Sequence, residues 1–258
     1  MRQFLRPLLP VLLLLPLACA AFAMPVAAAV NLATAPIDRN DLPWWHQRFI
    51  QSVAEARTHP DARIVWLGDS ITQNWQRIGT PGYDNILPIW NEYYAPYDAL
   101  DFGFKGDTTA SLIWRLDHGQ VAGLHPQLAI ILIGANNLGR VHWGAAMTIP
   151  GIESVVSLTH QRLPDSHILL LGVLPSVRSA WVDQQTALIN AALTEDYAHS
   201  AVVTFVNAGP TLLHDGRPDL ALYIDPKMAP PEPALHPDAT GMARIAAFIQ
   251  PEVKHYTE

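Results

Sequence analysis

The clearest indication of the fold comes from one stretch of the sequence, RIVWLGDSIT at residues 63–72. Its first half, residues 63–67, is a short run of mostly apolar residues with strong β propensity, which is typical of a buried strand. Gly68 and Asp69 then end the run, and Ser70 begins a segment that suits a helix. A strand that passes directly into a helix predicts an α/β fold.

Four further β-prone runs follow along the chain, at residues 99–102, 128–133, 167–172 and 202–206. Segments with helical spacing lie around and between the strands, at residues 44–57, 108–116, 151–163, 181–197 and 240–249. Apolar strands with little polar alternation are expected where helices cover both faces of a parallel sheet. The sequence therefore predicts a single three-layer α/β/α domain with a central five-stranded parallel sheet.

The first 29 residues have the composition of a secretory signal peptide. Arg2 and Arg6 give a basic start, residues 8–17 form an apolar run, and small residues at 21–23 and 27–29 offer cleavage sites. The apolar run is shorter than the roughly 20 residues that span a bilayer. We expect residues 1–29 to be a signal peptide, residues 30–60 a linker and first helix, and residues 61–258 the main domain of a periplasmic or secreted protein.

The remaining composition argues against several kinds of partner. The chain has 16 Lys and Arg against 23 Asp and Glu, a net charge of −7, which offers a nucleic acid no basic surface. Its one cysteine, Cys19, lies in the predicted signal peptide, so the mature chain would have no disulfide and no thiolate metal ligand. We expect no nucleic-acid partner and no transmembrane segment, and the oligomeric state stays open.

Three loops at the carboxyl edge of the predicted sheet, where such sheets bind ligands, carry polar or glycine residues. Ser70 begins a helix, where free backbone N–H groups and the helix dipole favour an anion. Gly106, after the second strand, can bring its backbone N–H close to a substrate oxygen. Asn136, after the third strand, could donate its amide to the same oxygen. Taken singly, each could also be a helix cap or a turn residue.

His236 lies in the segment LHPDATG, residues 235–241, directly before the last predicted helix. It is a natural general base for a serine nucleophile. The chain has 11 histidines, so this one carries little weight alone. The ordered set of Gly-Asp-Ser, Gly, Gly-x-Asn-Asn and Leu-His-Pro motifs is rarely produced by unrelated caps and turns, and it favours a catalytic site.

With Ser70, Gly106, Asn136 and His236 in this order, the chain resembles the SGNH, or GDSL-type, hydrolases, named for those four residue types. Within that superfamily, the stretch LDFGFKGDTT at residues 100–109 is similar to the catalytic subunits of platelet-activating-factor acetylhydrolase. The resemblance implies a flavodoxin-like SGNH hydrolase fold in the main domain and a serine esterase activity that needs no metal or cofactor.

The third member of the implied triad is displaced in this chain. Relatives usually carry the acid three residues before the histidine, where it orients the ring, but this chain has Pro233 there. Asp225, which precedes an insertion at residues 226–233, is the acid that we favour. Glu232 is a second candidate, and a backbone carbonyl is a third.

The resemblance implies acyl transfer, in which Ser70 attacks an ester carbonyl and His236 takes its proton. The backbone N–H groups of Ser70 and Gly106 and the amide of Asn136 would hold the oxyanion. We expect short-chain esters, chiefly acetyl esters on a polysaccharide or glycoside, as substrates. Five aromatic residues could stack on sugars: Trp75, Trp90, Tyr93, Tyr94 and Trp143. The alternatives are an acetyltransferase acting on an exported polysaccharide and a non-catalytic carbohydrate-binding module.

Overall fold

A five-stranded parallel sheet forms the centre of the structure, a computed structural model that describes residues 30–79 and 83–258. The strands are ordered β2-β1-β3-β4-β5, and every neighbouring pair is parallel. Their bounds are Ile64–Gly68 for β1, Leu100–Gly103 for β2, Leu128–Leu132 for β3, His167–Leu171 for β4 and Val203–Val206 for β5. The five predicted strands are confirmed, each to within one residue at either end.

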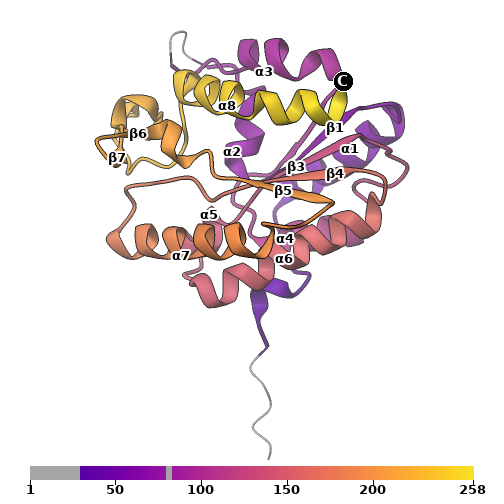
Figure 1. Ribbon diagram of the computed structural model, residues 1–258, viewed down its shortest axis with the longest axis horizontal. Helices are drawn as coiled ribbons and strands as arrows, with labels where there is room; N and C mark the ends of the chain where they lie inside the picture. Colours follow the sequence, from indigo (N-terminus) through magenta and orange to yellow (C-terminus); the bar gives the residue numbers. More distant parts are fainter. Residues whose placement is uncertain (1–29, 80–82) are drawn as a thin grey trace, which may run out of the picture. The chain divides into compact units, whose positions relative to one another are not determined.

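Helices cover both faces of this sheet, as Figure 1 shows. The α-helices are α1 Pro43–Thr58, α2 Ser70–Gln73, α3 Leu87–Tyr93, α4 Thr109–Asp117, α5 Ala135–Gly139, α6 Ala145–Arg162, α7 Ala180–Asp196 and α8 Ala239–Thr257. Helices α4, α6 and α7 pack side by side on one face, and α3 and α8 pair on the other. The predicted three-layer α/β/α arrangement is confirmed.

The shorter elements lie mostly in the connections. They are the 3₁₀ helices η1 Leu32–Thr34, η2 Asn74–Gln76, η3 Ala95–Tyr97, η4 Gly209–Leu212, η5 Leu220–Leu222 and η6 Asp225–Lys227, and the antiparallel strands β6 Leu213–His214 and β7 Arg217–Pro218. Three of them, η4 to η6, and the β6–β7 pair fall between β5 and α8. This connection is therefore the least regular part of the described chain.

Two helices are longer than the sequence pattern predicts. Helix α6 begins six residues early and runs through Pro150, and α8 continues past Pro251 to Thr257. A proline inside a helix removes one backbone hydrogen bond and usually ends or kinks it. Here each extension carries a buried residue, Thr148 before Pro150 in α6 and Val253 after Pro251 in α8. These residues keep the extended helices packed on the domain.

Aromatic residues from β1, η2 and the α3 region fill the core on one face of the sheet. The rings of Trp66, Trp75 and Tyr94 lie 5.0–5.3 Å apart between centroids, in tilted and edge-to-face arrangements. Trp75, Trp90 and Tyr94 are at most 4% exposed. The expectation that these three side chains stack on a sugar is therefore wrong, because packing against the sheet buries them; Tyr93 and Trp143 are partly exposed.

The N-terminal segment is docked on the domain rather than extended from it. Asn31–Glu258 forms one compact unit, and Thr109 Oγ1 of α4 donates to the Ala33 carbonyl at 2.7 Å. The predicted signal peptide, residues 1–29 with Cys19, lies outside the described residues. Among the helices of the described ranges, none is long and apolar enough to cross a membrane.

Candidate active site

Ser70 is the first residue of α2 and follows β1 after a single intervening residue, Asp69. The Asp69 side chain accepts a hydrogen bond from the backbone N–H of Ile71 at 2.9 Å, which caps the helix. Gly68 ends the strand, and a side chain there would overlap the Leu132 carbonyl of β3. The tight turn thus presents Ser70 at the carboxyl edge of the sheet, 8% exposed.

The structure brings His236 and Asp225 to Ser70. Ser70 Oγ lies 3.0 Å from His236 Nε2, and His236 Nδ1 lies 2.6 Å from Asp225 Oδ1. A carboxylate can only accept, so Nδ1 carries the proton and Nε2 is left to accept from the Ser70 hydroxyl. The three side chains therefore form one continuous hydrogen-bonded chain.

Asp225 also holds the backbone around the histidine. Its Oδ2 accepts the N–H groups of Leu235 at 2.8 Å and His236 at 2.7 Å. Burial opposes the charge on Asp225, but the hydrogen bonds and charge of His236 and the N–H of Leu235 lower its pKa below the usual value. Of the three candidates for the acid, Asp225 is the one that contacts the ring, whereas Glu232 meets Asp225 through its backbone N–H.

The candidate oxyanion donors Gly106 and Asn136 lie in the loops after β2 and β3, the two strands that flank β1. Gly106 has a φ of +78°, a conformation that favours glycine, and its N–H has no acceptor among the described residues. The Asn136 amide donates to the Asp107 carbonyl at 3.0 Å and to Asp69 Oδ2 at 3.3 Å. It thereby links the residue before Ser70 to the residue after Gly106. Burial raises the pKa of Asp69 to about 6.

A buried ionic network lies beneath this loop, and the sequence did not reveal it. Asp107, fully buried, accepts from Trp45 Nε1 at 2.7 Å, Arg115 Nε at 2.9 Å and Arg39 Nη1 at 3.0 Å. Burial raises the pKa of Asp107, and these three donors, two of them charged, oppose that rise by stabilising the carboxylate. The one available signal was Arg115, a charged residue among the buried positions of a short helix.

Arg115 joins this network to the strand ends. Its two terminal nitrogens donate to the carbonyls of Gly68 at 3.0 Å and Phe102 at 3.1 Å, the last parts of β1 and β2. Burial lowers the pKa of Arg115 to about 10, so the guanidinium stays charged at neutral pH. One side chain thus ties the loop of Gly106 to the strand that leads into Ser70.

A cavity of about 490 Å³ opens beside Ser70 and His236. Apart from Ile224 and Met228, its lining is polar or charged. The polar side chains that line it outside the hydrogen-bonded chain include Arg48, Gln73, Asn74, Gln76, Arg77 and Lys105. Neither Gly106 nor Asn136 lines it, but the lining extends from His236 to Lys105, the residue before Gly106.

Comparison with known proteins identifies a family that matches the part of the chain carrying Ser70, Gly106, Asn136 and His236. Residues 66–244 match the GDSL-like lipase/acylhydrolase family. Platelet-activating factor acetylhydrolase IB subunit alpha1 of Bos taurus is 28% identical over 170 residues, which are 66% of this chain and 66% of that relative. The chain thus spans just under two thirds of the length of that relative.

Solved structures share the fold. A GDSL-like lipase from Bacteroides thetaiotaomicron has a TM-score of 0.59 and 19% identity, covering 80% of this chain and 97% of that one. A carbohydrate acetylesterase family member from Sinorhizobium meliloti has a TM-score of 0.56 and 18% identity, covering 75% and 98%. The predicted membership in the SGNH/GDSL superfamily is confirmed: the chain belongs to the GDSL-like lipase/acylhydrolase family, a family of hydrolases that act on ester bonds.

Proposed function

We propose that the protein is an exported serine esterase that hydrolyses short-chain esters, chiefly acetyl esters, of a polar alcohol such as a polysaccharide or glycoside. The observation that carries this proposal is the hydrogen-bonded chain from Asp225 through His236 to Ser70 Oγ. Such a chain lets a neutral imidazole accept the serine proton while a carboxylate stabilises the imidazolium that forms.

The reaction proceeds in two halves. Ser70 Oγ attacks the ester carbonyl carbon as His236 Nε2 takes the hydroxyl proton, and the tetrahedral intermediate collapses when His236 returns that proton to the leaving alcohol oxygen. Water then attacks the acyl-enzyme with His236 as base, and the acid leaves as Ser70 recovers its proton. Each half begins and ends with a neutral histidine.

The negative oxygen of the intermediate is held by the N–H groups of Ser70 and Gly106 and by the Asn136 amide. Without substrate the amide is occupied, and its longer bond, 3.3 Å to Asp69, is the one that the oxyanion replaces. Each such donor contributes roughly 3 kcal/mol to transition-state stabilisation in related chemistry.

The cavity supports a polar alcohol part of the ester. Several amides and cations in its lining can hydrogen-bond to hydroxyl groups. The fold likeness to a carbohydrate acetylesterase family member is consistent with this choice.

The test compares 4-nitrophenyl acetate, butyrate and octanoate hydrolysis by the purified protein, by Ser70→Ala and by Ser157→Ala, an exposed serine on α6. We expect acetate to be hydrolysed fastest, Ser70→Ala to lose at least about 10³-fold in kcat, and Ser157→Ala to match the wild type. Equal rates in Ser70→Ala and the wild type would refute the nucleophile. Acetyl transfer to an added oligosaccharide without hydrolysis would indicate an acetyltransferase, and sugar binding without either activity a binding module.

Export rests on the composition of residues 1–29 and needs its own experiment. Full-length protein and a variant lacking residues 2–29 are expressed in a Gram-negative host, and the cell fractions are assayed by intact mass. We expect the full chain to reach the periplasm or medium shortened near residue 23 or 29. Full-length, uncleaved protein that stays in the cytoplasm would contradict the proposal.

A further inference from the structure

Cationic side chains line the cavity beside Ser70, although the chain as a whole is acidic. Arg48, Arg77 and Lys105 lie in the lining of this cavity, in a chain of net charge −7. We call these three residues the cationic wall. The acidic lining residues in the described chain are Asp225, which His236 engages, and Glu232.

Arg48 is held in place by backbone carbonyls. Its Nε donates to the Gly103 carbonyl at 2.7 Å and its Nη2 to the Asp101 carbonyl at 3.2 Å. The guanidinium also lies over the Phe104 ring, 5.0 Å from its centroid. These contacts orient the group but do not neutralise it. Burial raises the pKa of the nearby Asp101 carboxyl to about 7, so at neutral pH that group carries only part of a negative charge.

Lys105 extends from the loop that carries the adjacent oxyanion donor, Gly106. Its backbone N–H donates to Gln73 Oε1 at 2.7 Å and its carbonyl accepts from Arg39 Nη1 at 2.7 Å, so the loop is held from two sides. The Lys105 side chain is exposed, and its ammonium group has no hydrogen-bond or ion-pair partner among the described residues. It is a cation ready to meet an anion from solvent.

Arg77 differs from the other two because it is already paired. Its Nη2 donates to Asp84 Oδ2 at 2.9 Å, and its Nε also contacts the same carboxylate. Arg48 and Lys105 are therefore the members of the cationic wall that form no ion pair among the described residues.

The position of the cavity decides which part of an ester would meet these charges. His236 must return its proton to the leaving oxygen, so the alcohol part lies on the His236 side of Ser70. The cavity can hold the alcohol part, since it is lined by His236, Ile224 and Glu232 and extends from them to Arg48 and Lys105.

We infer that the alcohol part of the substrate carries an anionic group, a carboxylate, phosphate or sulfate, which Arg48 and Lys105 bind while Ser70 attacks the acyl group. This inference rests on the proposed esterase function and narrows its substrate to acetylated acidic sugars or similar anionic alcohols. A guanidinium and an ammonium that line one cavity attract such a group, and the attraction weakens with salt.

The experiment uses two matched substrates, a mono-O-acetylated methyl glucuronide and the same acetylated methyl glucoside, which differ by a carboxylate in place of a hydroxymethyl group. We expect the wild type to prefer the glucuronide by about tenfold or more in kcat/KM, mostly through KM, and to lose most of this preference between 50 and 500 mM NaCl. Acetylated glucose 6-phosphate, assayed in parallel, distinguishes a carboxylate site from a phosphate site.

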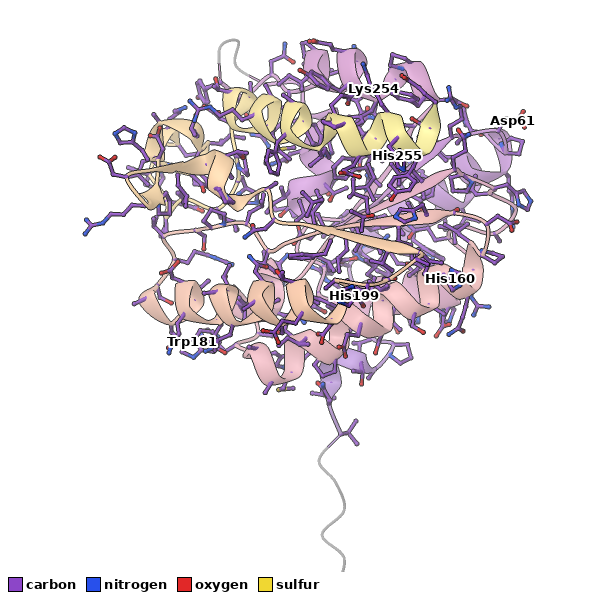
Figure 2. The ribbon with its side chains drawn as sticks, viewed as in Figure 1. Asp61, His160, Trp181, His199, Lys254 and His255 are labelled. Atoms are coloured by element: carbon purple, nitrogen blue, oxygen red, sulfur yellow. The ribbon has the colours of Figure 1, made fainter. Side chains whose placement is uncertain are left out.

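Substitutions in the cationic wall test which residues cause the preference for the glucuronide. Lys105→Gln, an exposed position, is expected to lower the glucuronide-to-glucoside ratio several-fold, and Lys105→Gln with Arg48→Gln to bring it near one. Lys254→Gln is the matched control. Lys254 lies near the C-terminal end of α8, roughly 22 Å along the helix from its first residue, Ala239, which is close to His236 in sequence. Figure 2 shows its place on the domain. This control should keep the wild-type ratio.

The possible failures are distinct. If the protein hydrolyses 4-nitrophenyl acetate and also hydrolyses the two acetylated sugars with equal kcat/KM, the proposal of an anionic substrate is refuted. The proposed esterase activity would then still hold. A glucuronide preference that survives Lys105→Gln and the double variant would remove the cationic wall from the explanation. Absence of hydrolysis of all esters by folded protein would reject both proposals.

Discussion

The two halves of the candidate site are built in different ways. Ser70, Gly106 and Asn136 stand at the ends of three adjacent strands, β1, β2 and β3, and a buried ionic network lies beneath them. The hydrogen bonds of the sheet fix the strand ends. The side chains of Arg115 and Asn136 then link the loops that follow these strands. This half, which we call the strand-end half, is held by many groups at once.

The other half depends on few contacts. His236 lies in the irregular connection between β5 and α8, and Asp225 supplies three of the hydrogen bonds that hold it, one to the ring and two to backbone N–H groups. A bridge between Tyr223 and Pro237 and an ion pair between Lys227 and Asp238 close the rest of the loop. We call this the histidine half.

Because the two halves are held differently, we expect substitutions in one to lower activity most and substitutions in the other to lower stability most. In the histidine half one side chain both orients the base and holds its backbone, so its loss should affect activity most. In the strand-end half the supporting charge is buried in the core, so its loss should affect folding most.

The largest effect is expected for Asp225→Ala. Loss of the carboxylate frees the ring to adopt the wrong tautomer and leaves the imidazolium uncompensated, so kcat should fall by about 10⁴-fold. Glu232→Ala is the matched control, since Glu232 lines the same cavity without a side-chain contact to the ring, and it should keep kcat within a few fold. The reverse pattern would move the acid to Glu232.

The next effect is on stability, in Arg115→Met. Removing one partner of a buried ion pair leaves Asp107 with less compensation, and we expect a loss of about 3–5 kcal/mol in the free energy of unfolding by urea denaturation. Arg162→Met breaks an exposed pair with Asp117 and should cost at most about 1 kcal/mol. Similar losses in the two variants would show that the strand-end half does not depend on its buried charges.

Asn136→Ala probes a donor in the strand-end half directly. We expect kcat to fall by about 10²–10³-fold, near 3–4 kcal/mol, with KM little changed, because the lost hydrogen bond forms in the transition state. A rise in KM at constant kcat would instead assign Asn136 to ground-state binding.

The smallest effect is a pH dependence from Asp101, which lies at the β2 end near Arg48. Burial raises its pKa from 3.8 to about 7, so the folded protein binds the proton more tightly than the unfolded chain. The stability contributed by protonated Asp101 is therefore lost as pH rises from about 4 through 7, by about 2 kcal/mol between pH 5 and pH 7.

Asp101→Asn keeps the oxygen that accepts from the Gly103 N–H but cannot ionise. Urea denaturation of both proteins at pH 5, 6 and 7 measures the difference. We expect the variant to gain stability relative to the wild type as pH rises, and parallel stability curves would contradict the buried ionisation.

The same contrast explains what the sequence could predict. The strand ends follow from local patterns, a β-prone run broken by glycine or a polar cap, so Ser70, Gly106 and Asn136 could be placed at one edge before the fold was known. The short helices α2, α3 and α5 span only four to seven residues, too few for a helical period to appear.

Long-range contacts could not be predicted in this way. Asp225 reaches His236 across the insertion at residues 226–233, whose path depends on the hydrogen bonds that the Asp225 side chain makes. Spacing alone favoured Asp225 but left Glu232 and a backbone carbonyl as further candidates. Arg115 meets Gly68 and Asp107 only after two strands and a helix have packed. The aromatic residues expected at sugars, such as Trp75, are buried because hydrophobic packing outweighed any surface role.

Covalent labelling of the nucleophile tests the catalytic pair of Ser70 and His236 most directly. Protein treated with an alkyl fluorophosphonate is measured by intact mass and then by peptide mapping, alongside Ser70→Ala and His236→Ala. We predict a single adduct on Ser70, no adduct in Ser70→Ala, and labelling at least about 10³-fold slower in His236→Ala, since the base activates the serine. An adduct on another serine, or labelling of the wild type no faster than of His236→Ala, would contradict the claim that Ser70 and His236 form the catalytic pair.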